Sequence, residues 1–333
     1  NLEEAFGVGT LNGVVTLFQS NARHRKLSSY FKETTEGVQG ELYAWDEISF
    51  ARRMAPITAP NAPSKPMKEM AKASRSTSLC HIKINKEIDG RKIFQVERNP
   101  GSLSPNAEAV VGREMAEMRT TIEKTIEYLS AGALQGSIVV SAAAIEDTDM
   151  SFTVTYAVTT FTYTTSWATD TTKIFTSSTE LPKLKNDYEK ALDTPLDRLL
   201  FNESITNYLV ANQQASAWLQ HTQPGISVFE SGFINRAVGL TFEQYDGNYK
   251  PTGGSVTKFI PDKTFIGFPD PSFYGQYLVM PLGRGLIPRS AIGNATAALI
   301  SEAPSPGWYA YGTAKDDPCT LKLIMGWIGL PLN

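Results

Sequence analysis

The sequence predicts an α+β fold, and three observations support this prediction. One apolar stripe between residues 104 and 134 is typical of a long amphipathic helix. Thirteen threonines lie between residues 148 and 179 and alternate in part with Phe, Val and Tyr, as in β-strands. The remaining segments show no regular alternation of strands and helices, which an all-parallel sheet would require.

The composition is that of a soluble globular protein. The 333 residues are 41% apolar and 20% charged, and a chain of this length buries enough surface for one large or two medium cores. No run of 18 apolar residues occurs and the first 20 residues lack the order of a signal peptide, so we expect no membrane partner. The two distant cysteines, Cys80 and Cys319, indicate neither a disulfide framework nor a zinc site, as in a reducing compartment.

The first 100 residues predict a polar arm followed by a long two-stranded excursion. Short β-like runs occur within residues 40–50 and 77–96, among them HIKI at 81–84 and KIFQV at 92–96. The stretch between them contains four prolines, which exclude a stable helix: Pro56, Pro60, Pro63 and Pro66. We therefore expect an extended loop at the tip of this excursion.

The basic residues of this loop are the candidate functional residues. Residues 21–100 contain 15 Lys and Arg against 9 Asp and Glu, a net charge of +6, so the rest of the chain carries −9. Glu69 is the one acidic residue among six basic ones: Arg52, Arg53, Lys65, Lys68, Lys72 and Arg75. They form either a solvated loop or an arm that docks on the acidic surface of a neighbouring copy. Nucleic-acid binding is a third alternative, but no aromatic residues alternate with these basic ones to stack on bases.

The long helix begins at Ser104, which supplies an N-cap before Pro105 in the first turn. Seven apolar residues recur at steps of three and four and predict its buried stripe: Val111, Met115, Met118, Ile122, Ile126, Leu129 and Ala133. The charged residues are assigned to its other faces: Arg113, Glu114, Glu117, Arg119, Glu123, Lys124 and Glu127. A strand follows, in which Phe152, Val154, Tyr156 and Val158 share one face, with a turn or bulge near residues 159–160.

The second half of the chain predicts two shorter helices and then strands. The first helix covers residues 181–192 and stops at Thr194 and Pro195, and the second covers 202–219 through Ile205, Leu209 and Trp218. The dipeptide Asp246-Gly247 lies between two β-like runs, 241–245 and 248–250, and predicts a hairpin.

No motif in the sequence supports catalysis. The GxSxG, GxxxxGK[ST] and HExxH patterns are absent, and none of the three histidines is spaced as a metal ligand. The one tight carboxylate cluster, Glu146-Asp147-Thr148-Asp149, is interpreted as a solvated turn, with a calcium site as the alternative. We therefore expect no enzyme, no catalytic residues, no cofactor and no metal, and an unrecognised hydrolase is the competing hypothesis.

The order of these elements resembles that of the tailed-phage major capsid proteins, closest to the lambda-like capsid protein E family. Four groups of residues show the resemblance, and they span nearly the whole chain. They are MAEMR at 115–119 with EYL at 127–129 and ALQG at 133–136; FNESI at 201–205 with YL at 208–209 and Asn212; Gly247 with FIPDK at 259–263; and PCTL at 318–321 with LPL at 330–332.

The resemblance implies a Hong Kong 97-like capsid fold. Its domains would be an N-terminal arm at residues 1–35, an E-loop at 36–95, a peripheral domain at 96–179 with a spine helix at about 104–134, an axial domain at 180–318, and a C-terminal strand at 319–333 that returns to the peripheral domain. The six basic E-loop residues would then make inter-subunit contacts.

The resemblance also implies a function: hexamers and pentamers that form the icosahedral head shell around double-stranded DNA. Implied partners are other copies of the chain, scaffolding, portal and decoration proteins, and packaged DNA bound without sequence specificity. The implied location is the virion, after assembly in the host cytoplasm. A gene-transfer particle or a cellular nanocompartment with the same fold is the alternative.

Overall fold

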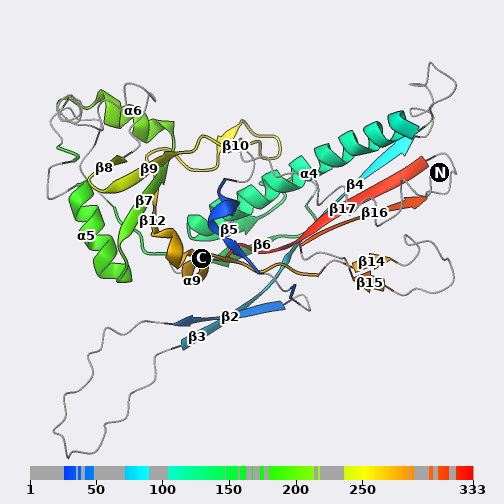
Figure 1. Cartoon of the computed structure of the whole chain (residues 1–333), viewed down its shortest axis with the longest axis horizontal. Helices are drawn as coiled ribbons and strands as arrows, with labels where there is room; N and C mark the ends of the chain where they lie inside the picture. The colour runs from blue at the N-terminus through cyan, green and yellow to red at the C-terminus, as the bar shows by residue number, and fades with distance from the viewer. Residues whose placement is uncertain are drawn as a thin grey trace, which may run out of the picture.

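The computed structural model describes most of the elements expected from the sequence. It covers residues 26–34, 37–38, 42–48, 72–89, 104–146, 148–156, 158–162, 167, 173–175, 180–213, 217, 236–284, 286–288, 300–302, 307–314 and 320–332. The described elements form two lobes, with one hairpin projecting away from them (Figure 1). One lobe contains a long helix on a sheet, and the other contains a four-stranded sheet with two short helices.

The predicted long helix is confirmed as α4, Ser104–Leu134. The apolar stripe from Val111 to Ala133 is buried as expected, with Ile122 and Ile126 fully inaccessible. This stripe packs on the sheet formed by β16 (Trp308–Ala314), β17 (Thr320–Gly329) and β4 (Cys80–Asp89), which are antiparallel in that order. Alternate residues of β17 are buried in the same core, as the two-residue period of a strand requires: Leu323, Met325 and Trp327.

A glycine in β17 allows an unusual crossing within this sheet. A Cβ at Gly326 would lie 2.3 Å from the ring of Tyr309, so any other residue there would collide with that ring. Because the space is open, the Tyr309 ring of β16 lies over the central strand, and its hydroxyl forms a hydrogen bond with Nε2 of His81 on β4. The two edge strands are thus joined by side chains across the strand that separates them.

The predicted two-stranded excursion exists, but with a different second strand. β2 (Leu42–Ile48) pairs with β3 (Lys72–Ser78), whereas residues 80–89 leave the hairpin and pair with β17. The change of direction occurs at Leu79, which is buried in the main core and so holds the chain against the lobe. The expected strand at 92–96 lies outside the described residues.

The second lobe is built on the sheet β12 (Phe265–Pro269), β7 (Leu196–Phe201), β9 (Leu240–Gln244) and β8 (Arg236–Ala237), in that order. Helices α5 (Leu181–Leu192) and α6 (Glu203–Ala211) accompany it. β7 and β9 are parallel, while the other pairs are antiparallel. The fold is therefore α+β, and this sheet contains one parallel strand pair that the sequence did not predict.

Two predictions in this lobe are wrong. The second helix is not continuous to residue 219: α6 ends at Ala211, Asn212 has extended backbone angles (φ −70°, ψ 119°), and residues 213 and 217 are helical again. Trp218 lies outside the described residues. The hairpin around Asp246-Gly247 does not form: β9 pairs with β7 along Thr241–Gln244 and with β8 at Leu240 and Thr241. The next strand, β10 (Asn248–Tyr249), pairs instead with β11 (Thr257–Lys258).

Shorter elements complete the two lobes. β5 (Ser137–Val140) pairs with β6 (Phe152–Thr155); the predicted alternation is thus correct up to Thr155, but residues 158–162 are not in a strand. A 3-10 turn, η1 (Ser28–Tyr30), leads into β1 (Lys32–Glu33), which pairs with β13 (Val279–Met280). The others are η2 (Pro271–Phe273), α9 (Tyr274–Tyr277), and the pair β14 (Leu286–Pro288) and β15 (Ile300–Glu302).

The four-stranded sheet separates two hydrophobic cores. Leu200 and Phe268 face the larger core, which is shared with α4 and β17. Leu199, Phe201 and Phe242 face the smaller core, which is shared with α5 and α6. Within the part of the chain that the structure describes, no helix has the length and apolar character needed to cross a membrane.

Candidate inter-subunit surface

The β2–β3 hairpin projects away from both lobes and contains two of the six candidate residues (Figure 1). Lys72 lies opposite Ile48 and Arg75 lies opposite Trp45, and both basic side chains are exposed. The other four, Arg52, Arg53, Lys65 and Lys68, lie outside the described residues. The structure therefore places part of the predicted basic surface on a protruding strand.

The register of the hairpin sends Lys72 and Arg75 to opposite faces, because they are three residues apart. Arg75 shares its face with Trp45, and its Nη1 donates a hydrogen bond to the Thr155 carbonyl of β6 at 3.3 Å. Lys72 shares the other face with Leu42, whose side chain is 68% exposed. Arg75 thus fixes the hairpin to its own lobe, and Lys72 belongs to the face that is open to a partner.

The base of the hairpin is held by aromatic packing. Tyr43 and Trp45 stack with ring centroids 6.5 Å apart, and both pack against the larger core. Aromatic pairs of this kind add stability beyond the surface they bury. The hairpin therefore leaves the lobe from a fixed base.

A segment before the hairpin, residues 26–34, lies where the two lobes meet, and we call it the junction strap (Figure 1). Its Leu27 and Ser28 backbone N–H groups donate to the Glu127 carboxylate of α4, at 2.7 and 3.1 Å. The same carboxylate accepts from the Tyr245 hydroxyl at 2.8 Å. Glu127 is 1% exposed, so the assignment of this residue to an outer face of the helix is wrong, as it is for the buried Glu123.

The strap also contacts the four-stranded sheet. The Tyr30 ring stacks on Phe268 of β12 at 4.4 Å, and its hydroxyl donates to Glu243 of β9 at 2.6 Å. Glu243 forms salt bridges with Arg198 at 3.0 Å and Lys26 at 3.5 Å. Burial alone would raise the pKa of Glu243, but the hydrogen bond from Tyr30 and the charges of Lys26 and Arg198 lower it below its usual value. Glu243 is therefore an anionic link between the strap and the sheet.

Three of the segments that showed the family resemblance come together in one polar cluster. Asn202, fully buried at the start of α6, accepts a hydrogen bond from the Ser204 N–H at 3.1 Å. Its Nδ2 donates to the Ile260 carbonyl at 3.0 Å and to Asp262 at 2.9 Å. Gln135, at the end of the long helix, donates to the Phe259 carbonyl at 2.8 Å. The FNESI, ALQG and FIPDK segments, distant in sequence, are thus joined at the base of the second lobe.

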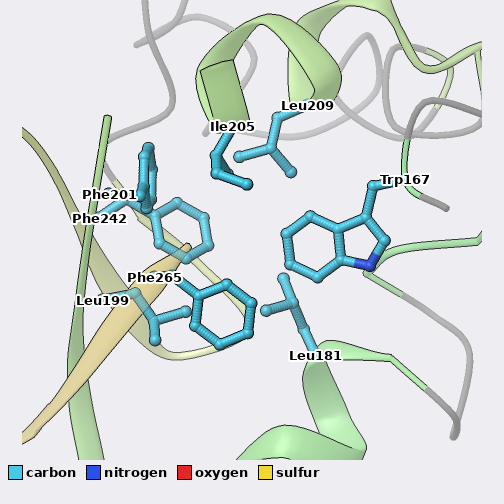
Figure 2. Close-up of a pocket in the computed structure, with 8 residues that line it drawn as sticks. All are labelled: Trp167, Leu181, Leu199, Phe201, Ile205, Leu209, Phe242 and Phe265. Atoms are coloured by element: carbon cyan, nitrogen blue, oxygen red, sulfur yellow. The ribbon is translucent and has the colours of Figure 1, made fainter. Parts of the chain in front are cut away.

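The pocket in the second lobe is part of a hydrophobic core and does not resemble a substrate site. Figure 2 shows its eight lining side chains converging, all of them apolar or aromatic: Trp167, Leu181, Leu199, Phe201, Ile205, Leu209, Phe242 and Phe265. The pocket volume is about 10 Å³, and a water molecule there would find no polar partners in the lining. The Trp167 Nε1–H instead donates to the buried Glu180 at 2.8 Å.

The carboxylate cluster at 146–149 is exposed, with Asp147 outside the described residues. Across the described ranges, no three His, Cys, Asp or Glu side chains gather as metal ligands would. Cys80 is buried and unbonded, and burial raises the pKa of its thiol to about 12.

Solved structures of other proteins are similar to this chain. A protein described as the capsid protein of a prophage in E. coli CFT073 matches with a TM-score of 0.52 and 12% identity, over 98% of this chain and 94% of that one. The capsid of cyanophage P-SCSP1u matches with a TM-score of 0.48 and 10% identity, over 91% and 83%. The holo-SrpI encapsulin complex of Synechococcus elongatus PCC 7942 matches with a TM-score of 0.42 and 12% identity, over 92% and 82%.

The search of curated proteins found no match. The family model described as phage major capsid protein E matches residues 10–279, which is most of the chain. The solved prophage protein shares the fold, which is the Hong Kong 97-like capsid fold. The chain therefore belongs to the phage major capsid protein E family.

Proposed function

We propose that this major capsid protein assembles as hexamers and pentamers into the icosahedral head shell of a tailed phage, around double-stranded DNA. The family match over residues 10–279 is the observation that supports this most strongly. The protruding β2–β3 hairpin supports it physically, since its outward face exposes Leu42 and Lys72 where a neighbouring copy could cover them. Many modest contacts of this kind close into rings when a rotation axis relates the copies.

The proposed domain assignment follows the resemblance, with two changes. The arm (1–35), the E-loop (36–95), the peripheral domain (96–179), the axial domain (180–318) and the C-terminal strand (319–333) remain the framework. However, β4 and β16 pair with β17, so we assign both strands to the peripheral domain. The β2–β3 hairpin, without β4, then forms the E-loop.

The proposed partners are the proteins and nucleic acid of a phage head. Copies of this chain make the shell, and scaffolding, portal and decoration proteins would attach to it. Packaged DNA would touch its inner surface without sequence readout, through phosphate contacts that depend on salt. The proposed location is the virion, after assembly in the host cytoplasm.

The proposed function is tested by expressing the full chain and measuring particle size by sedimentation and electron microscopy. Closed shells are expected, and a monomer under every condition tested would refute the proposal.

The role of the basic loop is tested with Arg52→Glu combined with Arg53→Glu, which should keep the subunit folded but lower shell yield. Lys124→Glu combined with Lys250→Glu makes the same charge change elsewhere and is the matched control. Equal yields in the two double variants would refute inter-subunit contacts by the loop.

The alternative of a gene-transfer coat or nanocompartment predicts the same empty shells. Particles purified from the native source distinguish it, because a phage head would contain a phage genome. Host DNA fragments or a protein cargo inside the shell would favour the alternative.

A further inference from the structure

The junction strap contacts both lobes at once. On one side, its Leu27 and Ser28 N–H groups bind the buried carboxylate of Glu127 on α4. On the other side, Tyr30 stacks on Phe268 and bonds to Glu243, both in the four-stranded sheet. Leu27, Tyr30 and Phe31 are all buried in the larger core, so the strap fills the space between helix and sheet.

Glu127 also connects the lobes directly, because it accepts the Tyr245 hydroxyl from the segment after β9. A buried carboxylate is stable only while its oxygens keep their donors, and here three donors come from two separate segments. Each hydrogen bond requires its donor to approach the carboxylate from a particular direction. A rotation of one lobe against the other would therefore break at least one of the three bonds. The geometry at Glu127 therefore selects one arrangement of the lobes.

The strap is held in this position by its continuation. β1 pairs in parallel with β13, and the Thr34 N–H donates to the Met280 carbonyl at 3.1 Å. Val279 of β13 in turn pairs with Leu332 near the end of the chain. The strap is thus attached to three parts of the subunit that are far apart in sequence.

We propose that the junction strap and Glu127 together set the angle between the two lobes, and through it the curvature of the assembled shell. This inference rests on the proposed function, since curvature has meaning only in a shell. In a closed assembly each subunit repeats the same angle, so a small change in one subunit alters the size at which the shell closes. Glu127 and Tyr30 are positioning residues for assembly.

The first test measures the lobe angle in unassembled full-length protein. Spin labels on Lys124→Cys in α4 and Asn186→Cys in α5, both exposed positions, report the distance between lobes in a Cys319→Ser background. The Cys80 thiol is buried, which protects it from labelling. Glu127→Gln replaces one acceptor oxygen by an amide donor, so at least one of three donors loses its acceptor. A broader distance distribution is expected, and an unchanged one would overturn the proposal whether or not shells form.

The second test measures shell diameter by electron microscopy. In Glu127→Gln, the fraction of particles with the parental diameter should fall at least about two-fold, because the angle is no longer unique. Glu117→Gln makes the same change at an exposed position of α4 and should leave the diameter unchanged. If Glu127→Gln fails to fold, Tyr30→Phe decides, since it removes only the hydroxyl and keeps the ring on Phe268. If the folded variant forms shells of the same diameter as the unmutated protein, the inference is overturned. If the unmutated protein itself forms no shells, the proposed function is refuted instead.

Discussion

At the scale of single residues, charged side chains link segments of this subunit that are distant in sequence. Glu243 links Lys26 and Tyr30 of the strap to Arg198 of β7, and it remains ionised because these groups lower its pKa. A carboxylate whose pKa is lower in the folded state than in the unfolded chain stabilises the fold above its unfolded pKa. That stabilisation is lost as the pH falls through the folded pKa.

Replacing Glu243 by Gln should therefore reduce stability in a pH-dependent way. The free energy of unfolding of the variant should be lower than that of the parent at pH 7, and the difference should shrink as the pH falls below about 4.5. Urea unfolding at pH 7, 5, 4 and 3 (about these values) measures this difference. A gap between the two proteins that stays constant with pH would contradict the role of the charge.

At the scale of elements, α6 depends on a residue outside it. Asn202 caps the helix through the Ser204 N–H and also satisfies the Ile260 carbonyl, so one buried side chain fixes a helix start and a loop. The same side chain bonds to Asp262, which in turn accepts from Lys258 at 3.0 Å. The position of α6 relative to the loop is thus set by polar contacts at its first turn.

Asn202→Ala should destabilise the subunit by about 2–4 kcal/mol, because a cap is lost and buried groups lose their partner. The measurement is the free energy of unfolding from urea titration, with Asn186→Ala on the exposed face of α5 as the control. The control should change stability little, since alanine is a good helix former at an exposed position. A similar small change in both variants would show that the cluster contributes little.

At the scale of the whole molecule, charge is divided between the loop region and the rest of the chain. Residues 21–100 carry +6 and the remainder −9, and we propose that these opposite charges attract neighbouring copies to one another. Opposite potentials of this kind speed association more than they strengthen it, and salt screens them.

The rate of shell assembly should therefore fall as salt increases. Between about 0.05 and 0.5 M NaCl the screening length shortens from more than 10 Å to a few Å, so steering between copies weakens. Light scattering during assembly of the purified full chain measures the rate. Assembly that is equally fast or faster at high salt would indicate that apolar contacts dominate, and the charge division would then have no role in association.

The sequence predicted elements that depend on local pattern and missed those that depend on distant partners. The stripe from Val111 to Ala133 specifies α4 by itself, and Pro195 marks the end of α5 by its own chemistry. Glu127 was misplaced because a glutamate beside an apolar stripe is usually exposed, and its donors come from residues 27, 28 and 245.

The same reason explains the errors in strand pairing. Asp246-Gly247 has the form of a hairpin turn, but β9 pairs with β7 and β10 pairs with β11, and these partners are known only from the sheet order. Residues 80–89 have the alternation of a strand, but their partner, β17, lies at the other end of the sequence. For the candidate surface, the composition was enough to identify the basic loop. Only the strand register shows that Arg75, which bonds within its own lobe, and Lys72 lie on opposite faces of the hairpin.

The central position of β17 determines when its sheet can form as the chain is synthesised. Among the described strands, β4 and β16 do not pair with each other, so their sheet requires residues 320–329, which leave the ribosome after all the other described strands. Until then, the apolar stripe of α4 lacks the buried face of β17, and a nascent chain exposes it to chaperones and to other chains. The sheet of β16, β17 and β4 is therefore complete only after β17 has been synthesised, so the core beneath α4 closes late in folding.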